Sequence, residues 1–184
     1  MSAAFNPKDK IRRFHHVALE VSDMAASINF YCDVFGYQLT EQHEASEVPA
    51  IPVELAFLRL GENHHDMVLS TDPNKNYRAR DDRDDREGPV AIHHVAWQCE
   101  SRESWLEMIE HVKNLGLEIV RGPVVHSAWQ EGGEGSWGEN ESFYVLDPDG
   151  HKVELFCDMA TIADDGVFVS HKGQRIEEAK ALEY

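Results

Sequence analysis

The stretch FHHVALEV, residues 14–21, returns as IHHVAWQC at residues 92–99, and this repeat decides the fold. In an extended strand, successive side chains point to opposite faces. In both copies the first histidine therefore shares a face with the large apolar residues, and the second shares a face with small or polar ones. We expect two equivalent strands, with His16 and His94 facing a polar cavity.

A helix is predicted after each of these strands, because apolar residues recur there at helical spacing. Ser22 or Asp23 can cap the first helix and Gly36 can end it, while Ser101 and Gly116 bracket the second. Three strand-like stretches follow each glycine. They are YQLTEQ, VELAFLRL and HHDMVLS in the first half, and LEIVRG, ESFYVLD and HKVELFC in the second.

The chain is thus predicted to be an α+β protein built from two tandem βαβββ modules. The first module covers residues 12–71, a charged and solvated linker covers 72–91, and the second module covers 92–158. A tail with a helical, charged end occupies residues 159–184. Three roles are open for this tail: it covers the cavity, it binds a second subunit, or it is a plain surface helix.

Composition excludes several classes of function. A formal charge of −17 argues against binding to nucleic acid or to an anionic membrane surface. No apolar run reaches the roughly twenty residues that span a bilayer, and the N-terminal residues lack the apolar core of a secretion signal. Three widely spaced cysteines suggest neither a disulfide framework nor a thiolate zinc site. We expect a cytoplasmic protein and a homo-oligomer.

A doubled βαβββ unit resembles the vicinal oxygen chelate superfamily, over about residues 12–158. This superfamily includes glyoxalase I, methylmalonyl-CoA epimerase, fosfomycin- and bleomycin-resistance proteins, and type I extradiol dioxygenases. The resemblance implies a mixed sheet curled around a metal cavity, with ligands from the first and last strand of each module. The corresponding positions are His16, His94, Glu154 and the end strand around Met67.

Two imidazoles and one carboxylate, from His16, His94 and Glu154, leave about three positions of an octahedral ion open. Such a site suits iron(II) that binds a substrate and dioxygen together; Mn(II), Zn(II) and Ni(II) are the alternatives. Aligning the last strands puts Met67 opposite Glu154, where glyoxalase I and the epimerase would supply a fourth ligand. Methionine is a poor ligand for a hard ion, which favours the extradiol branch.

The segment AFLRLGENHHDMVL, residues 56–69, resembles the extradiol segment that carries a catalytic histidine in an HH pair. The resemblance implies that His65 is an acid/base and not a ligand, a role suited to an unperturbed pKa of ~6.5. His65 shares strand parity with Met67, so we expect it to face the metal. The alternative is that His64 and His65 decorate an exposed turn.

The run GPVVHSAWQEGGEGSWGENESFYVLDPDGHKVEL, residues 122–155, resembles the closing segment of the same family. The resemblance implies that His126 and Tyr144 contact the substrate oxygen, although strand parity alone leaves Tyr144 undecided. The Gly-rich insert between them is longer than in the family. We expect it to form a lid, with Trp129 or Trp137 packing on the substrate; a loose surface insertion is the alternative.

The resemblance therefore implies an iron(II)-dependent extradiol dioxygenase that opens the ring of a catecholic compound with dioxygen. Two other readings stay open. One is a lyase or epimerase of the superfamily that uses nickel, zinc or cobalt. The other is a metal-free protein that binds a small molecule, such as a drug, although such members lack the ligand set.

Overall fold

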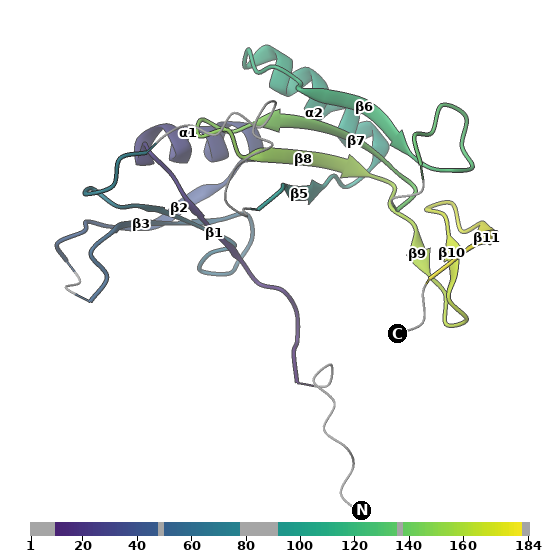
Figure 1. The fold of residues 1–184 in the computed structure, drawn as a ribbon, viewed down its shortest axis with the longest axis horizontal. Coiled ribbons are helices and arrows are strands. Elements are labelled where there is room, and N and C mark those ends of the chain that lie inside the picture. Colours follow the sequence, from purple (N-terminus) through teal and green to yellow (C-terminus); the bar gives the residue numbers. More distant parts are fainter. Residues whose placement is uncertain (1–9, 48–49, 78–91, 136–137, 182–184) are drawn as a thin grey trace, which may run out of the picture. The chain divides into compact units, whose positions relative to one another are not determined.

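The computed structural model describes residues 10–47, 50–77, 92–135 and 138–181 (Figure 1). The chain divides into two compact units, residues 1–78 and 79–184, here called unit 1 and unit 2. No helix in the described ranges is both long and apolar enough to cross a membrane. Most of the charged linker, residues 78–91, lies outside the described residues.

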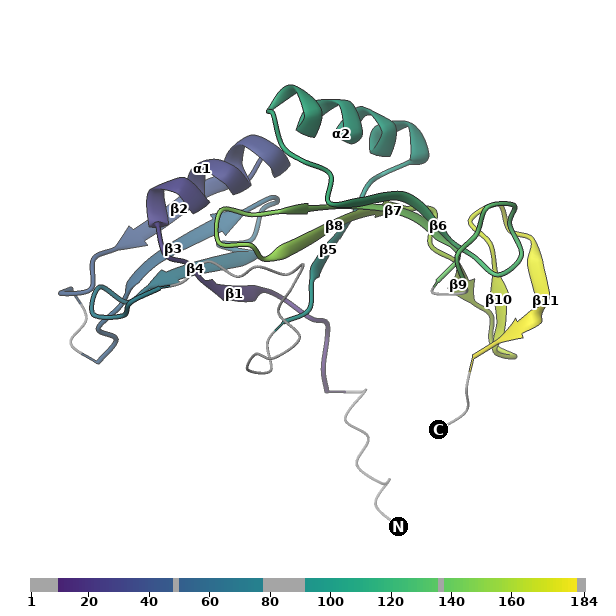
Figure 2. The same cartoon turned by 45° about the horizontal axis from the view of Figure 1, so that its top comes forward.

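Unit 1 is a βαβββ module. Its elements are β1 (Val17–Glu20), α1 (Met24–Phe35), β2 (Gln38–His43), β3 (Glu54–Arg59) and β4 (Met67–Thr71). The sheet order is β1-β4-β3-β2, with β1 parallel to β4 and the other pairs antiparallel. The helix α1 lies over one face of this mixed sheet (Figure 2).

The local signals for α1 act as the sequence predicts. Of the two candidate caps, Asp23 begins the helix, and its side chain accepts a hydrogen bond from Ala26 N. Gly36 ends it in the left-handed conformation, with φ of 74°. The strand β1 alternates as expected, because Leu19 and Val21 are buried whereas Ala18 is exposed.

Unit 2 repeats the module. Its elements are β5 (Val95–Gln98), α2 (Arg102–Asn114), β6 (Arg121–His126), β7 (Asn140–Leu146) and β8 (Lys152–Cys157). The sheet order β5-β8-β7-β6 matches that of unit 1, and β5 is again parallel to β8. Two βαβββ modules of an α+β fold are therefore confirmed.

The two faces of the unit 2 sheet differ in polarity. On the face toward α2, Trp105 packs against Phe143 with ring centroids 5.8 Å apart, and its indole Nε1 donates to Leu155 O over 2.9 Å. Val145 and Val153 are fully buried. The alternate residues of β7 and β8 point to the opposite face, where polar side chains gather.

The tail is a small sheet, so the predicted helical end is wrong. Its strands are β9 (Thr161–Ile162), β10 (Val167–Val169) and β11 (Arg175–Lys180), in the order β11-β10-β9. The helix-forming composition of the tail is outweighed because Ala179 on β11 is buried and Phe168 pairs with Ile176.

Two details of the first strands and of β6 also differ from expectation. The first histidines, His15 and His93, are exposed and do not join the apolar face, because both strands begin after the pair. The strand predicted at residues 117–122 begins instead at Arg121 and runs to His126. Leu117 N donates a hydrogen bond to Val112 O in the last turn of α2, so the chain leaves the helix later and the strand begins later than expected.

Candidate functional site

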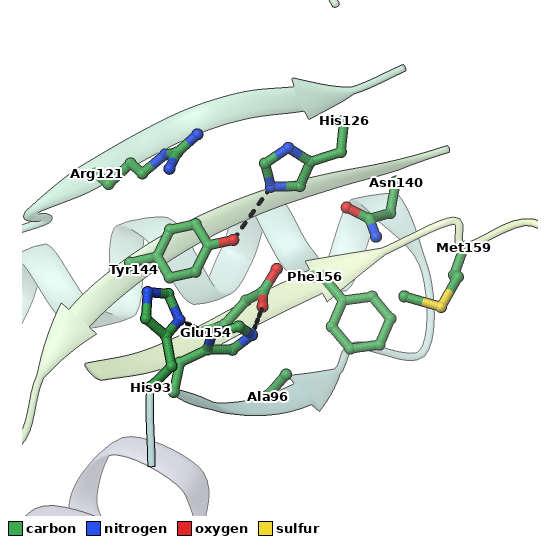
Figure 3. Close-up of a pocket in the computed structure, with 10 residues that line it drawn as sticks. His93, Ala96, Arg121, His126, Asn140, Tyr144, Glu154, Phe156 and Met159 are labelled. Atoms are coloured by element: carbon green, nitrogen blue, oxygen red, sulfur yellow. Dashed lines mark hydrogen bonds and ion pairs between the residues drawn. The ribbon is translucent and has the colours of Figure 1, made fainter. Parts of the chain in front are cut away.

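A pocket of about 510 Å³ opens on the polar face of the unit 2 sheet (Figure 3). All four strands of the sheet contribute to it. Four of the residues expected in the site lie here: His94, His126, Tyr144 and Glu154. The remaining lining residues are His93, Ala96, Arg121, Asn140, Phe156 and Met159.

Strand register explains why these side chains meet. Ala96 on β5 pairs with Glu154 on β8, and His94, just before β5, lines the same pocket. Tyr144 on β7 is the direct antiparallel partner of Glu154. Directly paired residues project from the same face, so the register settles the orientation of Tyr144 that sequence parity had left open.

Glu154 lies at the centre of a polar network. Its Oε2 is 3.1 Å from His94 Nε2, and its Oε1 accepts a hydrogen bond from Ser142 Oγ over 2.5 Å. The Ser142 oxygen also lies 3.0 Å from Oδ1 of Asn140. The carboxylate is only 6% exposed. A buried carboxylate is costly unless it is hydrogen-bonded or holds a cation, and this one is oriented for both.

The first histidine of the second pair contacts the second one. Nδ1 of His93 lies 2.6 Å from Nδ1 of His94, so a hydrogen bond between these atoms leaves Nε2 of His94 directed at Glu154. Metal-binding histidines are commonly oriented by a hydrogen bond to the other ring nitrogen. His93 thus has a positioning role that strand parity did not predict.

His126 and Tyr144 form a second polar pair in the pocket. His126 Nε2 lies 3.1 Å from the Tyr144 hydroxyl, and both side chains are buried. Burial lowers the pKa of His126, so its ring is neutral at pH 7. Burial, with a further contribution from the Glu154 charge, raises the pKa of Tyr144 to about 12, so its hydroxyl keeps its proton.

The donor atoms of unit 2 fit one metal ion. Metal–ligand bonds of about 2.1 Å put neighbouring donors of an octahedral ion about 3.0 Å apart. The His94 to Glu154 separation of 3.1 Å agrees with that spacing. One imidazole and one carboxylate on this polar sheet face are therefore spaced as two adjacent ligands of a divalent ion would be.

Unit 1 carries the other predicted residues. His16 precedes β1 just as His94 precedes β5, and Nδ1 of His15 lies 3.1 Å from Nδ1 of His16. The rings of His16 and His65 have centroids 4.7 Å apart. Burial, and then the electrostatic effect of the neighbouring His16, lowers the pKa of His65. His65 is therefore next to His16 and not on an isolated exposed turn.

The counterpart of Glu154 in unit 1 is one residue away from Met67, the residue expected from the sequence. In unit 1, Ala18 pairs with Val68, just as Ala96 pairs with Glu154 in unit 2. Val68 is therefore the counterpart, whereas Met67 is fully buried in the core. Because β4 begins at Met67, strand parity also does not reach His65. A valine offers no donor atom at all at the fourth ligand position.

The Gly-rich insert is tied to unit 2 and does not place Trp129 over the pocket. Trp129 lines a different pocket, beside the tail residues His171 and Lys172. Ser127 Oγ donates to the buried Glu139 Oε2 over 2.6 Å and accepts from the backbone N–H of residues 129 and 130. Trp129 therefore does not line the unit 2 pocket in this structure, and Trp137 lies outside the described residues.

Several pocket residues were not found from the sequence. Phe156, and Ser142, which contacts Glu154 without lining the pocket, could have been found, because each lies two residues from a predicted site residue on the same strand face. Arg121, whose guanidinium is 5.7 Å from the Tyr144 ring centroid, precedes the GPVVH element that we quoted. Met159 follows the last strand of the module and has no sequence signal.

The chain matches the Glyoxalase/Bleomycin resistance protein/Dioxygenase superfamily over residues 13–155. It is 27% identical over 153 residues to biphenyl-2,3-diol 1,2-dioxygenase 2 of Rhodococcus globerulus, covering 83% of this chain and 66% of the relative. It is 29% identical over 143 residues to lactoylglutathione lyase of Escherichia coli O157:H7, covering 78% and 90%. The matched part thus spans less than two thirds of that dioxygenase.

Solved structures show the same fold. A glyoxalase family protein from Enterococcus faecalis aligns with a TM-score of 0.57 at 20% identity, covering 80% of this chain and 98% of the other. A fosfomycin resistance protein from Listeria monocytogenes, complexed with Mn(II) and sulfate, aligns with a TM-score of 0.52 at 18% identity, covering 80% and 93%. With the doubled βαβββ fold and the match over residues 13–155, the chain belongs to the Glyoxalase/Bleomycin resistance protein/Dioxygenase superfamily.

Proposed function

We propose that the protein is an iron(II)-dependent extradiol dioxygenase that cleaves the ring of a catecholic compound. The observation that carries this proposal is the pairing of two polar dyads in one pocket. His94 and Glu154 form the metal-binding dyad, and His126 with Tyr144 forms a hydrogen-bonding dyad on the neighbouring strands. The similarity to a biphenyl-diol dioxygenase supports the same assignment.

His16, His94 and Glu154 are the residues that would hold the ion. Iron(II), when bound, supplies adjacent open positions for the diol and for dioxygen and carries electrons between them. His93 holds the ring of His94, and Ser142 holds the carboxylate of Glu154. These contacts keep the two donors of unit 2 oriented before any ion arrives.

Tyr144 and His126 would orient the diol. The Tyr144 hydroxyl keeps its proton, since its pKa is raised to about 12, and can donate a hydrogen bond to an ionised diol oxygen. The neutral His126 ring holds that hydroxyl in position over 3.1 Å. Phe156 and Met159 line the pocket with apolar surface that suits an aromatic ring and limits water.

His65 would move protons. It lies beside His16 in unit 1, and its lowered pKa keeps it neutral and able to accept a proton from the diol at pH 7. Its Nδ1 is 3.0 Å from Nδ1 of His64, whose Nε2 is 3.0 Å from Glu41 Oε2. This chain of contacts would orient His65.

A lyase of the lactoylglutathione type is the second candidate. It is favoured by the match to the Escherichia coli lyase, which extends over 90% of that protein. Such an activity would use nickel, zinc or cobalt. Val68 at the position equivalent to Glu154 weighs against a four-ligand isomerase site. A metal-free binding protein would not need the contact between His94 and the buried carboxylate of Glu154.

Anaerobic reconstitution with iron(II), followed by oxygen-electrode assays on a panel of substituted catechols, tests the proposal. We expect oxygen uptake that depends on both iron and catechol, together with a coloured ring-opened product. The same preparation loaded with nickel or zinc should be assayed with the glutathione hemithioacetal of methylglyoxal. Turnover of that compound, with no oxygen uptake on any catechol, would contradict the dioxygenase assignment and support the lyase assignment.

A further inference from the structure

We propose that unit 1 contains a second metal-binding arrangement of its own, made of His15, His16 and His65, which takes a zinc-class divalent ion. One nitrogen from each of the three rings can be chosen so that all lie within 4.8 Å of one another. Elsewhere in the described residues no other set of three histidine, cysteine or acidic side chains meets this condition.

The distances within the group are those of metal ligands. Nδ1 of His15 and Nδ1 of His16 are 3.1 Å apart. Bonds of about 2.1 Å give donor separations of about 3.0 Å in octahedral and about 3.4 Å in tetrahedral geometry. The His65 ring has its centroid 5.6 Å from that of His15 and 4.7 Å from that of His16. Small rotations of the exposed His15 and His16 and of the half-buried His65 would bring all three nitrogens onto one ion.

Topology explains why three imidazoles converge at this end of the sheet. The strands β1 and β4 are parallel neighbours, and Val17 pairs with Met67 (Figure 2). The residues just before the two strands therefore lie side by side. His15 and His16 both precede the regular strand, so alternation does not force them to opposite faces.

Unit 2 provides an internal comparison. Its register pairs Val95 with Val153, so the counterpart of His65 is His151. His151 Nδ1 is instead 2.8 Å from Asp147 Oδ2, and its backbone N donates to Oδ1 of the same residue. The DPDG turn thus holds His151, whereas His65 is directed at the histidine pair. The three-imidazole group is a feature of unit 1 and not of the repeat.

The donor set selects the class of ion. Three imidazoles with no carboxylate suit zinc, nickel, cobalt or copper better than manganese or iron(II), which prefer oxygen donors. The carboxylate of Asp66, the residue after His65, accepts hydrogen bonds from Leu60 N over 2.9 Å and from Asn63 Nδ2 over 3.2 Å. The contact between His64 and His65 orients the third ring.

The proposal of a metal site at His15, His16 and His65 does not depend on the proposed function. An ion bound there would nevertheless affect two of the residues proposed to act in catalysis. A neutral imidazole has one nitrogen lone pair free for a metal, so zinc on His15, His16 and His65 would withdraw His16 from His94 and Glu154. It would also occupy the proposed acid/base His65. Zinc-class ions would then inhibit the enzyme by competing for residues rather than by blocking the pocket.

The test uses the full chain carrying both His94→Ala and Glu154→Gln, which removes the donors of unit 2. Cobalt(II) and zinc(II) are titrated, cobalt by its visible absorption and zinc by competition with a chromophoric chelator. We expect one ion per chain, with a visible cobalt spectrum that zinc abolishes. Adding His15→Ala should weaken binding by at least about 10- to 100-fold, the loss that removal of an outer-shell partner alone would cause, and adding His151→Ala, the unit 2 counterpart of His65, should leave it unchanged.

Two outcomes would overturn the proposal. One is the absence of zinc or cobalt binding in the double variant, and the other is equal affinity after His15→Ala or His65→Phe. Electron paramagnetic resonance of bound copper(II) provides a second measurement, because three imidazole nitrogens should be resolved and fewer would contradict the site. Iron content and oxygen uptake of the unaltered chain report separately on the proposed function.

Discussion

Nε2 of His94, just before β5, lies 3.1 Å from Oε2 of Glu154 on the parallel neighbouring strand β8. The contact joins the start of the module to its last strand, so the second histidine of the IHHVAWQC segment and the closing glutamate lie side by side. The other ring nitrogen of His94 contacts His93, and the other oxygen of Glu154 contacts Ser142. Both donors are therefore fixed in orientation by their own neighbours.

Removing a metal donor should remove the metal. In His16→Ala, His94→Ala and Glu154→Ala, the iron content of the anaerobically reconstituted protein should fall from about one per chain to a small fraction, because two donors hold a labile ferrous ion poorly. Ser142→Ala should lower iron affinity by only about 10- to 100-fold, since it acts through Glu154. Metal analysis after gel filtration measures both.

The matched control for these variants is His111→Ala, which changes a histidine on α2, outside the pocket-lining residues. Its iron content should equal that of the unaltered protein. Full iron in the His94→Ala protein would show that the repeat histidines are not ligands, and the assignment of the site would then fail.

His65 should be separable from the ligands. His65→Phe is expected to keep its iron yet lower kcat by roughly 10²- to 10⁴-fold, the range for a positioned acid/base. The phenyl ring preserves packing against Phe57, whose centroid lies 5.2 Å from that of His65. Turnover and iron content are measured on the same preparation, without zinc. A parallel fall of iron and rate would make His65 an iron ligand.

Thiol reactivity should follow burial. Burial raises the pKa of Cys99 to about 11 and that of Cys157, which has no exposed surface, to about 12. At pH 8 their thiolate fractions are then roughly 10⁻³ and 10⁻⁴. Iodoacetamide at pH 8 should modify Cys32 first, Cys99 more slowly and Cys157 only after denaturation, as read by peptide mass spectrometry.

The same shifts set a direction for stability at high pH. Thiols of the unfolded chain ionise near pH ~8.5, whereas the folded chain holds the protons of Cys99 and Cys157 to higher pH. Ionisation therefore favours the unfolded state, and the free energy of unfolding should fall as the pH rises above about 8.5. Replacing Cys157 by Ala should reduce this dependence of stability on pH.

For the labelling experiment, modification of Cys157 as fast as Cys32 in the folded protein would contradict the burial of Cys157.

Much of this arrangement could be predicted because the repeat supplies its own alignment. The histidine pairs, the two helix caps and the alternation along β1 and β5 are local patterns, and the structure reproduces their order. Alternation also carries from Glu154 to Phe156. It ends where the strand ends, which is why His15 and His93 could not be placed and why parity did not apply to His65.

The remaining differences come from interactions between segments that local patterns do not encode. The tail has a helix-forming composition, yet β11 pairs with β10 through Phe168 and Ile176 and forms a strand. The one-residue choice between Met67 and Val68 depends on register, which the sequence alone did not settle. The position of Trp129 depends on contacts of the insert with Ser127 and Glu139.

The insert offers the last prediction. A Cβ on Gly133 would clash with the backbone oxygen of Ser127, next to the pocket residue His126, whereas a Cβ on Gly132 would meet nothing within 4 Å. The Ser127 oxygen cannot simply move, because it accepts a hydrogen bond from Gly135 N over 3.2 Å. Gly133→Ala must therefore displace the backbone beside His126.

Gly132→Ala is the matched control, because its φ of 76° costs an alanine only about 1–2 kcal/mol of strain. Gly133→Ala should lower the thermal midpoint further than Gly132→Ala, by about 2–4 °C for each additional kcal/mol. It should also raise the KM for the catechol through His126, while iron content stays near that of the unaltered protein. Equal midpoints and equal KM values for the two variants would show that the insert neither supports the fold of unit 2 nor positions His126.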